Sequence, residues 1–388
     1  MKRATSAGWP HCRRRPIARS AALAAVLTFA LPAQEPSPPQ PAAPEASVAP
    51  TANSLLQKLA APGLTAESAR ELCEQLDERP LAIRIQRFDT VCRQYAGLLQ
   101  AFTRSHERLP KLFAKAVPKV QRAAQGRGGD ATIATLRSQA LAITRGPDLT
   151  KERIHHDLDP LLEKLRALVL VDVETACAKD SALGAAVAAL RHDLDELREW
   201  SALYVDLMHA TDAEPEGRRQ LDQRRQEPEP PASSAIEQDL DCWCLAALPI
   251  GPRDQKVLEA NLADRATLDR EEFLGTLELN RIRIALGLAT LRIDAKLGNA
   301  ARDHSTDMRT RNFFSHDSPV DGKHSPWDRA ARAGTSASAE NIAAGHDTGK
   351  SAIRGWWYSP GHHKNMLGNH ARTGLGRSEG LWTQLFGG

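Results

Sequence analysis

The sequence predicts an α+β protein in which an all-helical domain precedes a C-terminal domain that combines helices with a short antiparallel sheet. Apolar residues recur at helical spacing through residues 53–212, where strand signals are sparse. Near the C-terminus, residues 373–377 and 381–386 have the composition of two strands joined by a Ser-Glu-Gly turn. Since 388 residues exceed one typical core, two domains are expected.

The N-terminal residues have the order of an export signal. A cluster of arginines at 13–19 precedes the apolar run 21–31, and Ala33 provides a small residue for cleavage. The run is shorter than the ~20 residues that span a bilayer comfortably. We therefore predict a signal peptide at residues 1–33, a secreted, periplasmic or cell-envelope location, and no integral membrane domain after its removal. A retained signal anchor is the alternative.

Composition then divides the rest of the chain. Residues 34–52 are rich in Pro and Ala with few large apolar residues, which indicates a disordered tether. Residues 53–212 form the helical domain, whose role the sequence does not reveal. Residues 213–267 begin with a charged, Pro-rich run and are interpreted as a linker and connecting segment. The C-terminal domain occupies residues 268–388.

Charge and cysteine content exclude some classes of function. The formal net charge of +3 argues against a nucleic-acid partner. Removal of the signal would leave an odd number of cysteines, so at least one thiol is unpaired or shared between chains. None lies after residue 244, so the C-terminal domain cannot depend on a disulfide. These cysteines, whose pairing the sequence does not give, are Cys73, Cys92, Cys177, Cys242 and Cys244. The Cys-Trp-Cys run at 242–244 is interpreted as packing rather than a metal site.

Three helices are predicted in the C-terminal domain. Asp269 followed three residues later by Glu272 has the spacing of a helix start. Pro360 is predicted to stop the third helix, in which apolar residues lie one turn apart. The predicted helices run from Asp269 to Gly287, from Leu297 to Met308 after Asp294, and from Lys350 to Tyr358.

Histidine and carboxylate side chains recur beside aromatic and turn residues in this domain. The segments are Phe313-Phe314-Ser315-His316, Ala339-Glu340-Asn341-Ile342-Ala343 and Trp356-Trp357-Tyr358-Ser359-Pro360-Gly361-His362. In this order they resemble the CAP superfamily (cysteine-rich secretory, antigen 5 and pathogenesis-related proteins; SCP domains). The resemblance covers about residues 278–388, and the absence of cysteine there favours the compact bacterial form. It implies a three-layer α-β-α sandwich.

The resemblance also implies a cleft lined by two histidines and acidic residues. The positions that match are His316, Glu340 and His362, whereas Ser359-Pro360 stands where the family has a second glutamate. Two imidazoles and one carboxylate are sufficient first ligands for a divalent metal such as zinc. They are equally suited to acid–base catalysis of a hydrolysis, or to a network of hydrogen bonds that holds the loops.

We expect a binding module rather than an enzyme, with no required cofactor beyond a candidate divalent metal. Its ligand would be an extracellular or cell-envelope peptide, glycan or lipid. The alternative is a hydrolase that acts on peptide or cell-wall polymer, with His316, Glu340 and His362 as catalytic residues.

The remaining histidines and tryptophans have structural interpretations. His304 is expected in the interior, and the histidines at 155 and 156 at a solvated helix start. Histidines expected in solvated loops are His324, His346, His363 and His370. Tryptophans expected in the core are Trp327, Trp356, Trp357 and Trp382.

Overall fold

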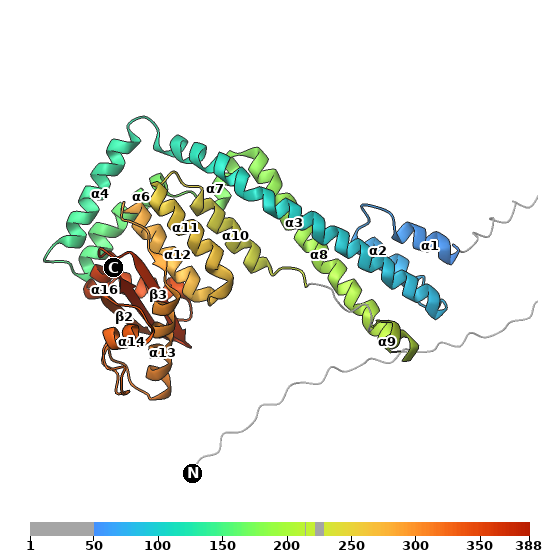
Figure 1. Cartoon of the computed structure of the whole chain (residues 1–388). Coiled ribbons are helices and arrows are strands. Elements are labelled where there is room, and N and C mark those ends of the chain that lie inside the picture. Colours follow the sequence, from blue (N-terminus) through green and yellow to red (C-terminus); the bar gives the residue numbers. More distant parts are fainter. Residues whose placement is uncertain (1–49, 214, 222–228) are drawn as a thin grey trace, which may run out of the picture. The chain divides into compact units, whose positions relative to one another are not determined.

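The structure, a computed structural model, describes residues 50–213, 215–221 and 229–388. The predicted signal peptide, and the predicted tether up to residue 49, lie outside these residues. The part from Pro50 onward is one compact unit, in which helices precede a four-stranded sheet (Figure 1). The predicted combination of a helical region with a C-terminal α+β region is confirmed.

The first region is all-helical, as expected. Its elements are α1 (Ala52–Leu59), α2 (Ala66–Glu74), α3 (Leu81–Gln125), α4 (Gly129–Arg145), α5 (Lys151–Arg153), the π-helical turn η1 (Ile154–Leu158), α6 (Asp159–Val169), α7 (Val173–Lys179), α8 (Ser181–Asp212) and α9 (Pro215–Leu221). The two longest helices, α3 and α8, lie side by side (Figure 1). Between them the rings of Phe88 and Tyr204 pack with centroids 5.2 Å apart, and Trp200 is fully buried.

Residues 213–267, interpreted from sequence as a linker and connecting segment, contain further helices. Besides α9, named above, these are α10 (Ser233–Ala246), α11 (Pro252–Asp264) and the 3-10 turn η2 (Arg265–Thr267). Cys242 and Cys244 are buried in α10, as the packing interpretation predicted, and the thiol of Cys244 donates to the carbonyl of Val171 at 3.1 Å. Burial raises the pKa of both thiols to about 12. The charged, Pro-rich composition therefore describes only the start of this segment.

The second region alternates helices and strands. Its elements are α12 (Arg270–Ala285), β1 (Arg292–Ile293), α13 (Ala295–Thr310), α14 (Pro326–Arg332), β2 (Ala339–Ala344), α15 (Gly349–Trp357), α16 (Pro360–Met366), β3 (Arg372–Ser378) and β4 (Leu381–Gly387). Asp269 and Asp294 cap α12 and α13 by accepting hydrogen bonds from first-turn backbone N–H groups. Pro360 does not end the helical structure here, because it occupies the first position of α16, where a missing N–H costs nothing.

The sheet has the strand order β1-β3-β4-β2, with β1 and β3 parallel and the other pairs antiparallel. Glu340 on β2 lies opposite Leu385 on β4, so both side chains point to one face. Leu385 packs there with Leu297 of α13 and Ala330 of α14. Helices α12, α15 and α16 contact the strands as well and form the third layer. The predicted α-β-α sandwich is confirmed.

Helix α13 approaches the sheet backbone to backbone. A Cβ atom added to Gly374 would lie 2.1 Å from the backbone nitrogen of Gly298, and one added to Gly376 would lie 1.9 Å from that of Arg302. Neither distance is possible for a side chain, so glycine is required at both strand positions. The close approach fixes the segment that leads from α13 into the His316 loop.

The helical and sheet-bearing regions share one hydrophobic cluster and several hydrogen bonds. Arg137 of α4 donates to the carbonyl oxygens of Ile284 (2.8 Å) and Ala285 (2.9 Å) at the end of α12. The carbonyl of Ile284 also accepts from the backbone N–H of Gly287 (3.0 Å), so Arg137 adds a cap from a distant segment to the local turn that ends α12. The domain boundary near residue 268 remains a prediction.

Candidate ligand site

The loop that carries His316 is anchored from beneath by His304. The Nε2 atom of His304, on α13, is 3.0 Å from the carbonyl oxygen of Ser315. His304 is fully buried, as predicted for an interior residue. Burial lowers its pKa, and the positive charge of Arg329 lowers it further. A neutral ring therefore holds the loop.

Glu340, on β2, is buried against a guanidinium. Its Oε2 atom accepts a hydrogen bond of 2.6 Å from Nη2 of Arg329, whose side chain is fully buried on α14. The same Nη2 atom donates to the carbonyl oxygen of His316 at 3.0 Å, and Nη1 donates to the carbonyl oxygens of Lys323 and His324. A buried ion pair is stable only when its remaining hydrogen-bonding atoms are also satisfied, and these carbonyls satisfy most of them.

The imidazole of His316 is oriented by the second oxygen of Glu340. Nδ1 lies 2.8 Å from Oε1, while the His316 side chain is 50 % exposed. The hydrogen bond to Glu340 raises the pKa of His316, and partial burial opposes the increase. Because Nδ1 faces the buried carboxylate, Nε2 is the nitrogen left for an incoming ligand.

His362 approaches the same place from α16. Burial lowers its pKa, and the positive charge of His316 lowers it further. Helix α16 is tied to β2 by Asn365, whose Nδ2 donates to the carbonyl oxygen of Glu340 (3.1 Å) and to Oδ1 of Asn341 (2.9 Å). Asn341 in turn donates to the carbonyl oxygen of His362 at 3.3 Å.

The structure thus brings the predicted residues together with unequal roles. His316 and Glu340 are in direct contact, and His362 stands on α16, which is tied by hydrogen bonds to the strand that carries Glu340. No group of three or more His, Cys, Asp or Glu side chains that could hold a metal ion occurs within residues 50–213, 215–221 and 229–388. Both oxygens of Glu340 already have partners, one in His316 and one in Arg329. Glu340 is therefore placed to orient a histidine that binds a metal and not to bind the metal itself.

Arg329, the residue on which the site depends most, was not predicted from the sequence. Nothing in its spacing distinguishes it from the exposed arginines of the chain. The only local signal is the capping box of Ser325 and Asp328, which starts α14 and directs its first turn. The sequence also did not predict that the charges of Arg329 and Glu340 act on His304.

Two predicted environments were wrong. His363 is not in a solvated loop but fully buried, with Nδ1 2.8 Å from the carbonyl oxygen of Trp357, and burial lowers its pKa to about 4. Trp327 is not in the core: it is 59 % exposed, and Phe314 is 53 % exposed. The other three tryptophans of the domain are buried, as predicted.

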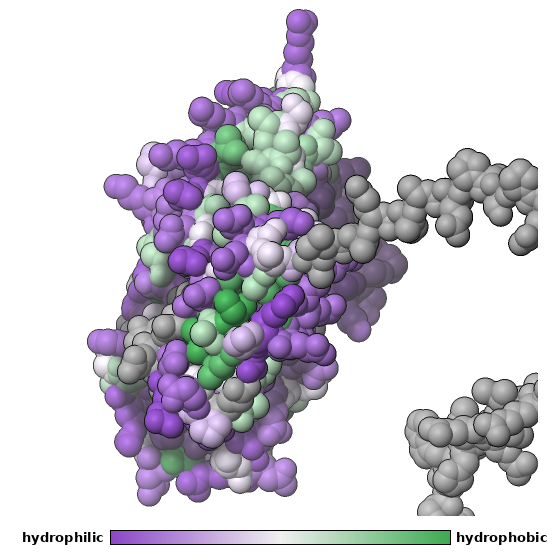
Figure 2. Space-filling view, turned by 90° about the vertical axis from the view of Figure 1, so that its right-hand side faces the viewer, coloured by the Kyte–Doolittle hydropathy of each residue, from purple (hydrophilic) through white to green (hydrophobic). Residues whose placement is uncertain are grey.

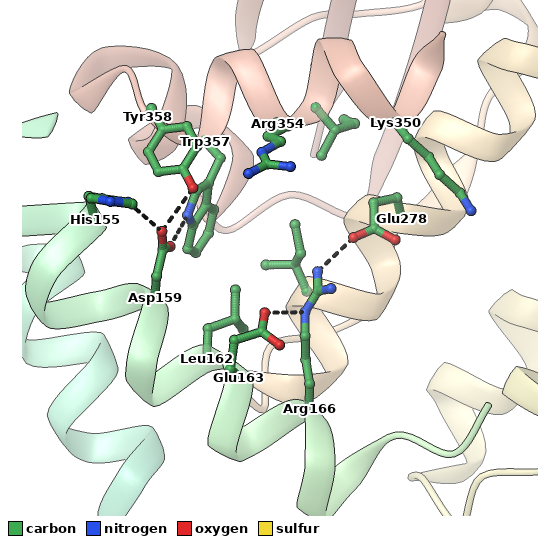
Figure 3. A pocket seen from close by; sticks show the side chains of 12 residues that line it. His155, Asp159, Leu162, Glu163, Arg166, Glu278, Lys350, Arg354, Trp357 and Tyr358 are labelled. Atoms are coloured by element: carbon green, nitrogen blue, oxygen red, sulfur yellow. Dashed lines mark hydrogen bonds and ion pairs between the residues drawn. The ribbon is translucent and has the colours of Figure 1, made fainter. Parts of the chain in front are cut away.

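A second candidate location lies where α6 meets α12 and α15, around a cavity of about 460 Å³ (Figure 3). Asp159 accepts hydrogen bonds of 2.8 Å from Nε1 of Trp357 and from the hydroxyl of Tyr358. Beside it Arg166 and Glu278 form an ion pair of 2.6 Å. Most of these polar groups satisfy one another, so the cavity is described best as the junction between the two regions.

Comparison with known proteins agrees with the fold and with the motif segments. A family model described as CAP, the cysteine-rich secretory protein family, matches residues 277–383. The chain is 40 % identical over 112 residues to the uncharacterized protein YkwD of Bacillus subtilis (strain 168), covering 28 % of this chain and 43 % of that protein. It is 34 % identical over 108 residues to the uncharacterized membrane protein YlbC of the same organism, covering 28 % and 31 %.

Among solved structures, an extracellular protein containing a SCP domain from Bacillus anthracis str. Ames has 33 % sequence identity and a TM-score of 0.28, covering 36 % of this chain and 44 % of that one. The chain spans less than half the length of each of these relatives. None of the helices in the described part of the chain is long and apolar enough to cross a membrane. Residues 277–383, with the sandwich and the His316–Glu340 contact described above, form a CAP domain of the compact bacterial type.

Proposed function

We propose that the CAP domain is a non-enzymatic binding module of an extracellular or cell-envelope protein, and that His316 and His362 contact the ligand. The observation that carries the proposal is the chain of contacts from Arg329 through Glu340 to His316. A buried guanidinium fixes the carboxylate, and the carboxylate fixes a half-exposed imidazole. Such preorganisation favours recognition because little entropy is lost when the ligand binds.

The same contacts argue against hydrolysis. A carboxylate neutralised by a buried arginine is a weak general base or nucleophile. The nearest hydroxyl in sequence, that of Ser315, accepts from the backbone N–H of Asp317 at 3.1 Å and so serves the turn of the loop. Activation of a serine would require a hydrogen bond from its hydroxyl to a base.

The donor set also suits a divalent metal. His316 Nε2 and an imidazole nitrogen of His362 would be the protein ligands, with Glu340 behind His316 in the arrangement usual for metal-binding histidines. A bound metal would supply a positive centre for an anionic or carbonyl group of the ligand. The exposed rings of Phe314 and Trp327 flank His316 and Arg329 in sequence and would contact the apolar part of a peptide, glycan or lipid.

An extracellular location is supported by two observations. The solved relative from Bacillus anthracis is described as extracellular, and the N-terminal sequence has the order of an export signal. An export assay tests the proposed location separately from the binding site. A reporter enzyme fused after residue 33 should be released from cells, and retention in the cytoplasm would contradict the location without bearing on the CAP site.

Zinc is the probe that tests the site. We expect isothermal titration of the full chain at neutral pH to give binding that His316→Ala and His362→Ala each weaken at least about tenfold. His192→Ala, a change on α8, is the control and should leave the affinity unchanged. Binding that survives both site variants would overturn the proposal. Cleavage of peptide or cell-wall fragments that His362→Ala abolishes would replace it with the hydrolase alternative.

A further inference from the structure

One face of α3 carries a row of cations. The residues recur every three or four positions, which places them on one side of a helix. Each of them is exposed. They are Arg104, Arg108, Lys111, Lys115, Lys119 and Arg122. Arg104 and Arg122 are 122 − 104 = 18 residues apart, which corresponds to about 27 Å along the helix axis.

The cation row points away from the protein. The buried residues of the same stretch include Leu109, Phe113 and Val117, which lie on the opposite side of the helix at 100° per residue. These apolar residues face the rest of the helical region. The row is therefore on the side of α3 away from its packed face, and at its C-terminal end Arg122 lines a cavity with Asp130 of α4 and Ile284 of α12.

The cations of the row are not neutralised by neighbours. Among the described residues, no ion pair or side-chain hydrogen bond involves any of the six, whereas Arg191 on α8 binds both Glu174 and Glu237. Glu107 is the one acidic residue between Arg104 and Arg122 on α3. Like charges one helical turn apart repel one another, so the row is stabilised by any anion that screens it.

The row also concentrates the charge of the chain. Residues 1–33 contribute six cations and no acid to the formal net charge of +3, so the chain that remains after removal of the predicted signal peptide carries 3 − 6 = −3. A weakly charged protein thus presents a strongly positive line of about one charge per 5 Å on one helix. A linear polyanion with repeating charges is complementary to such a line and would release condensed counterions on binding.

We propose that the cation row of α3 docks a linear acidic polysaccharide that carries carboxylate or sulfate groups. A membrane surface is disfavoured because adsorbed helices insert large apolar side chains beside their cations. The exposed large hydrophobic residues of the described chain are Val205, Phe314 and Trp327, none of them on α3. Figure 2 shows a face on which hydrophilic residues predominate and hydrophobic ones form smaller areas.

Single-stranded nucleic acid is disfavoured too, because the row has no aromatic side chain on which bases would stack. The preference for a glycan over duplex DNA rests on the proposed extracellular location. It does not depend on the His316 site, which lies on other elements, so either proposal can fail without the other.

The test uses the full-length chain and heparin of defined length as the probe. The triple variant Lys111→Ala/Lys115→Ala/Lys119→Ala keeps a strong helix former at each position. We expect it to bind heparin about tenfold or more weakly at 0.15 M salt, with a shallower dependence of affinity on salt. The control, Lys58→Ala/Lys164→Ala/Lys256→Ala, removes the same charge from exposed positions on α1, α6 and α11 and should change the affinity less than about twofold.

Circular dichroism and urea unfolding of both variants establish that the fold is intact. Equal losses of heparin affinity in the two variants would mean that heparin responds only to the net charge of the protein, and would overturn the proposal. So would absence of heparin binding by the unaltered chain. Tighter binding to duplex DNA or to phosphatidylglycerol vesicles than to heparin would overturn the choice of a polysaccharide.

Discussion

The helical region and the CAP domain are held together by different kinds of interior. In the helical region, apolar side chains such as Leu190, Leu194 and Leu197 recur along α8 and are buried against α3 and α7. In the CAP domain, polar side chains are buried together with the apolar ones. Arg283 donates to the carbonyl oxygens of Met366 (2.8 Å) and Gly368 (3.1 Å), for example.

The difference follows from the connections. Long helices satisfy their own backbone groups except at their ends, so their interior is mainly apolar, and the buried Arg87 and Gln121 donate to carbonyls at the ends of α2 and α6. The CAP domain has irregular segments between 311 and 338 and around 286–291. Carbonyls buried in such segments need donors from elsewhere, and Arg283, Arg329 and Asn280 provide them. A substitution in the CAP domain is therefore expected to act through unsatisfied polar groups, and one in the helical region through lost apolar volume.

The largest effect is expected from Arg329→Ala. The substitution leaves the carboxylate of Glu340 buried without its cation and leaves the carbonyls of the His316 loop without donors. Removal of one partner of a buried pair costs about 3–5 kcal/mol. Urea unfolding of this variant should be compared with that of Arg332→Ala, which removes an exposed arginine from the same helix. A loss below about 1 kcal/mol would contradict the role assigned to Arg329.

Leu190→Ala in α8 tests the other kind of interior. The side chain is fully buried, and its truncation removes apolar contacts and leaves a cavity without exposing any polar group. We expect a loss of about 2–5 kcal/mol in the free energy of unfolding, near the lower end where neighbouring helices relax into the space. Val205→Ala on the same helix is the control, because that side chain is 38 % exposed. Equal losses for both variants would contradict the buried assignment.

Gly374→Ala is expected to have a smaller, purely steric effect. The new methyl group would overlap the backbone of Gly298, so β3 and α13 must move apart at a cost of about 1–3 kcal/mol. Gly361→Ala, at a position where an added Cβ meets nothing within 4 Å, is the matched control. Thermal unfolding distinguishes the two. An unchanged midpoint for Gly374→Ala would show that helix and strand are not in close contact.

The smallest effect concerns pH. Because Glu340 raises the pKa of His316 above 6.5, the protonated ring stabilises the folded state below that pH. The contribution is lost as the pH rises through the folded-state pKa. The difference in melting temperature between the unaltered chain and His316→Gln should therefore be larger at pH 5.5 than at pH 8.5. In a Glu340→Gln background the pH dependence should disappear, and its persistence would assign the effect to another group.

The sequence predicted those parts of the CAP domain that depend on local signals. Asp269 and Asp294 identified two helix starts because capping is a contact within one turn. The resemblance to the CAP family identified His316 and Glu340, which the structure joins by a hydrogen bond. Residues whose environment is set by distant segments were missed. Arg329 is buried by a loop that precedes it. His363 is covered by α4, and its Nε2 atom lies 3.5 Å from the hydroxyl of Thr144 on that helix.

The buried thiols have a consequence for the behaviour of the chain under oxidation. Cys73, Cys242 and Cys244 are free, and burial raises the pKa of each to about 12, so these thiols are protonated at neutral pH. Thiolate is the species that oxidants and disulfides attack. The CAP domain contains no cysteine at all. A change between reducing and oxidising surroundings is therefore expected to leave these three thiols unaltered, and any sulfur chemistry of the described chain falls to the partly buried Cys92 and Cys177 of the helical region.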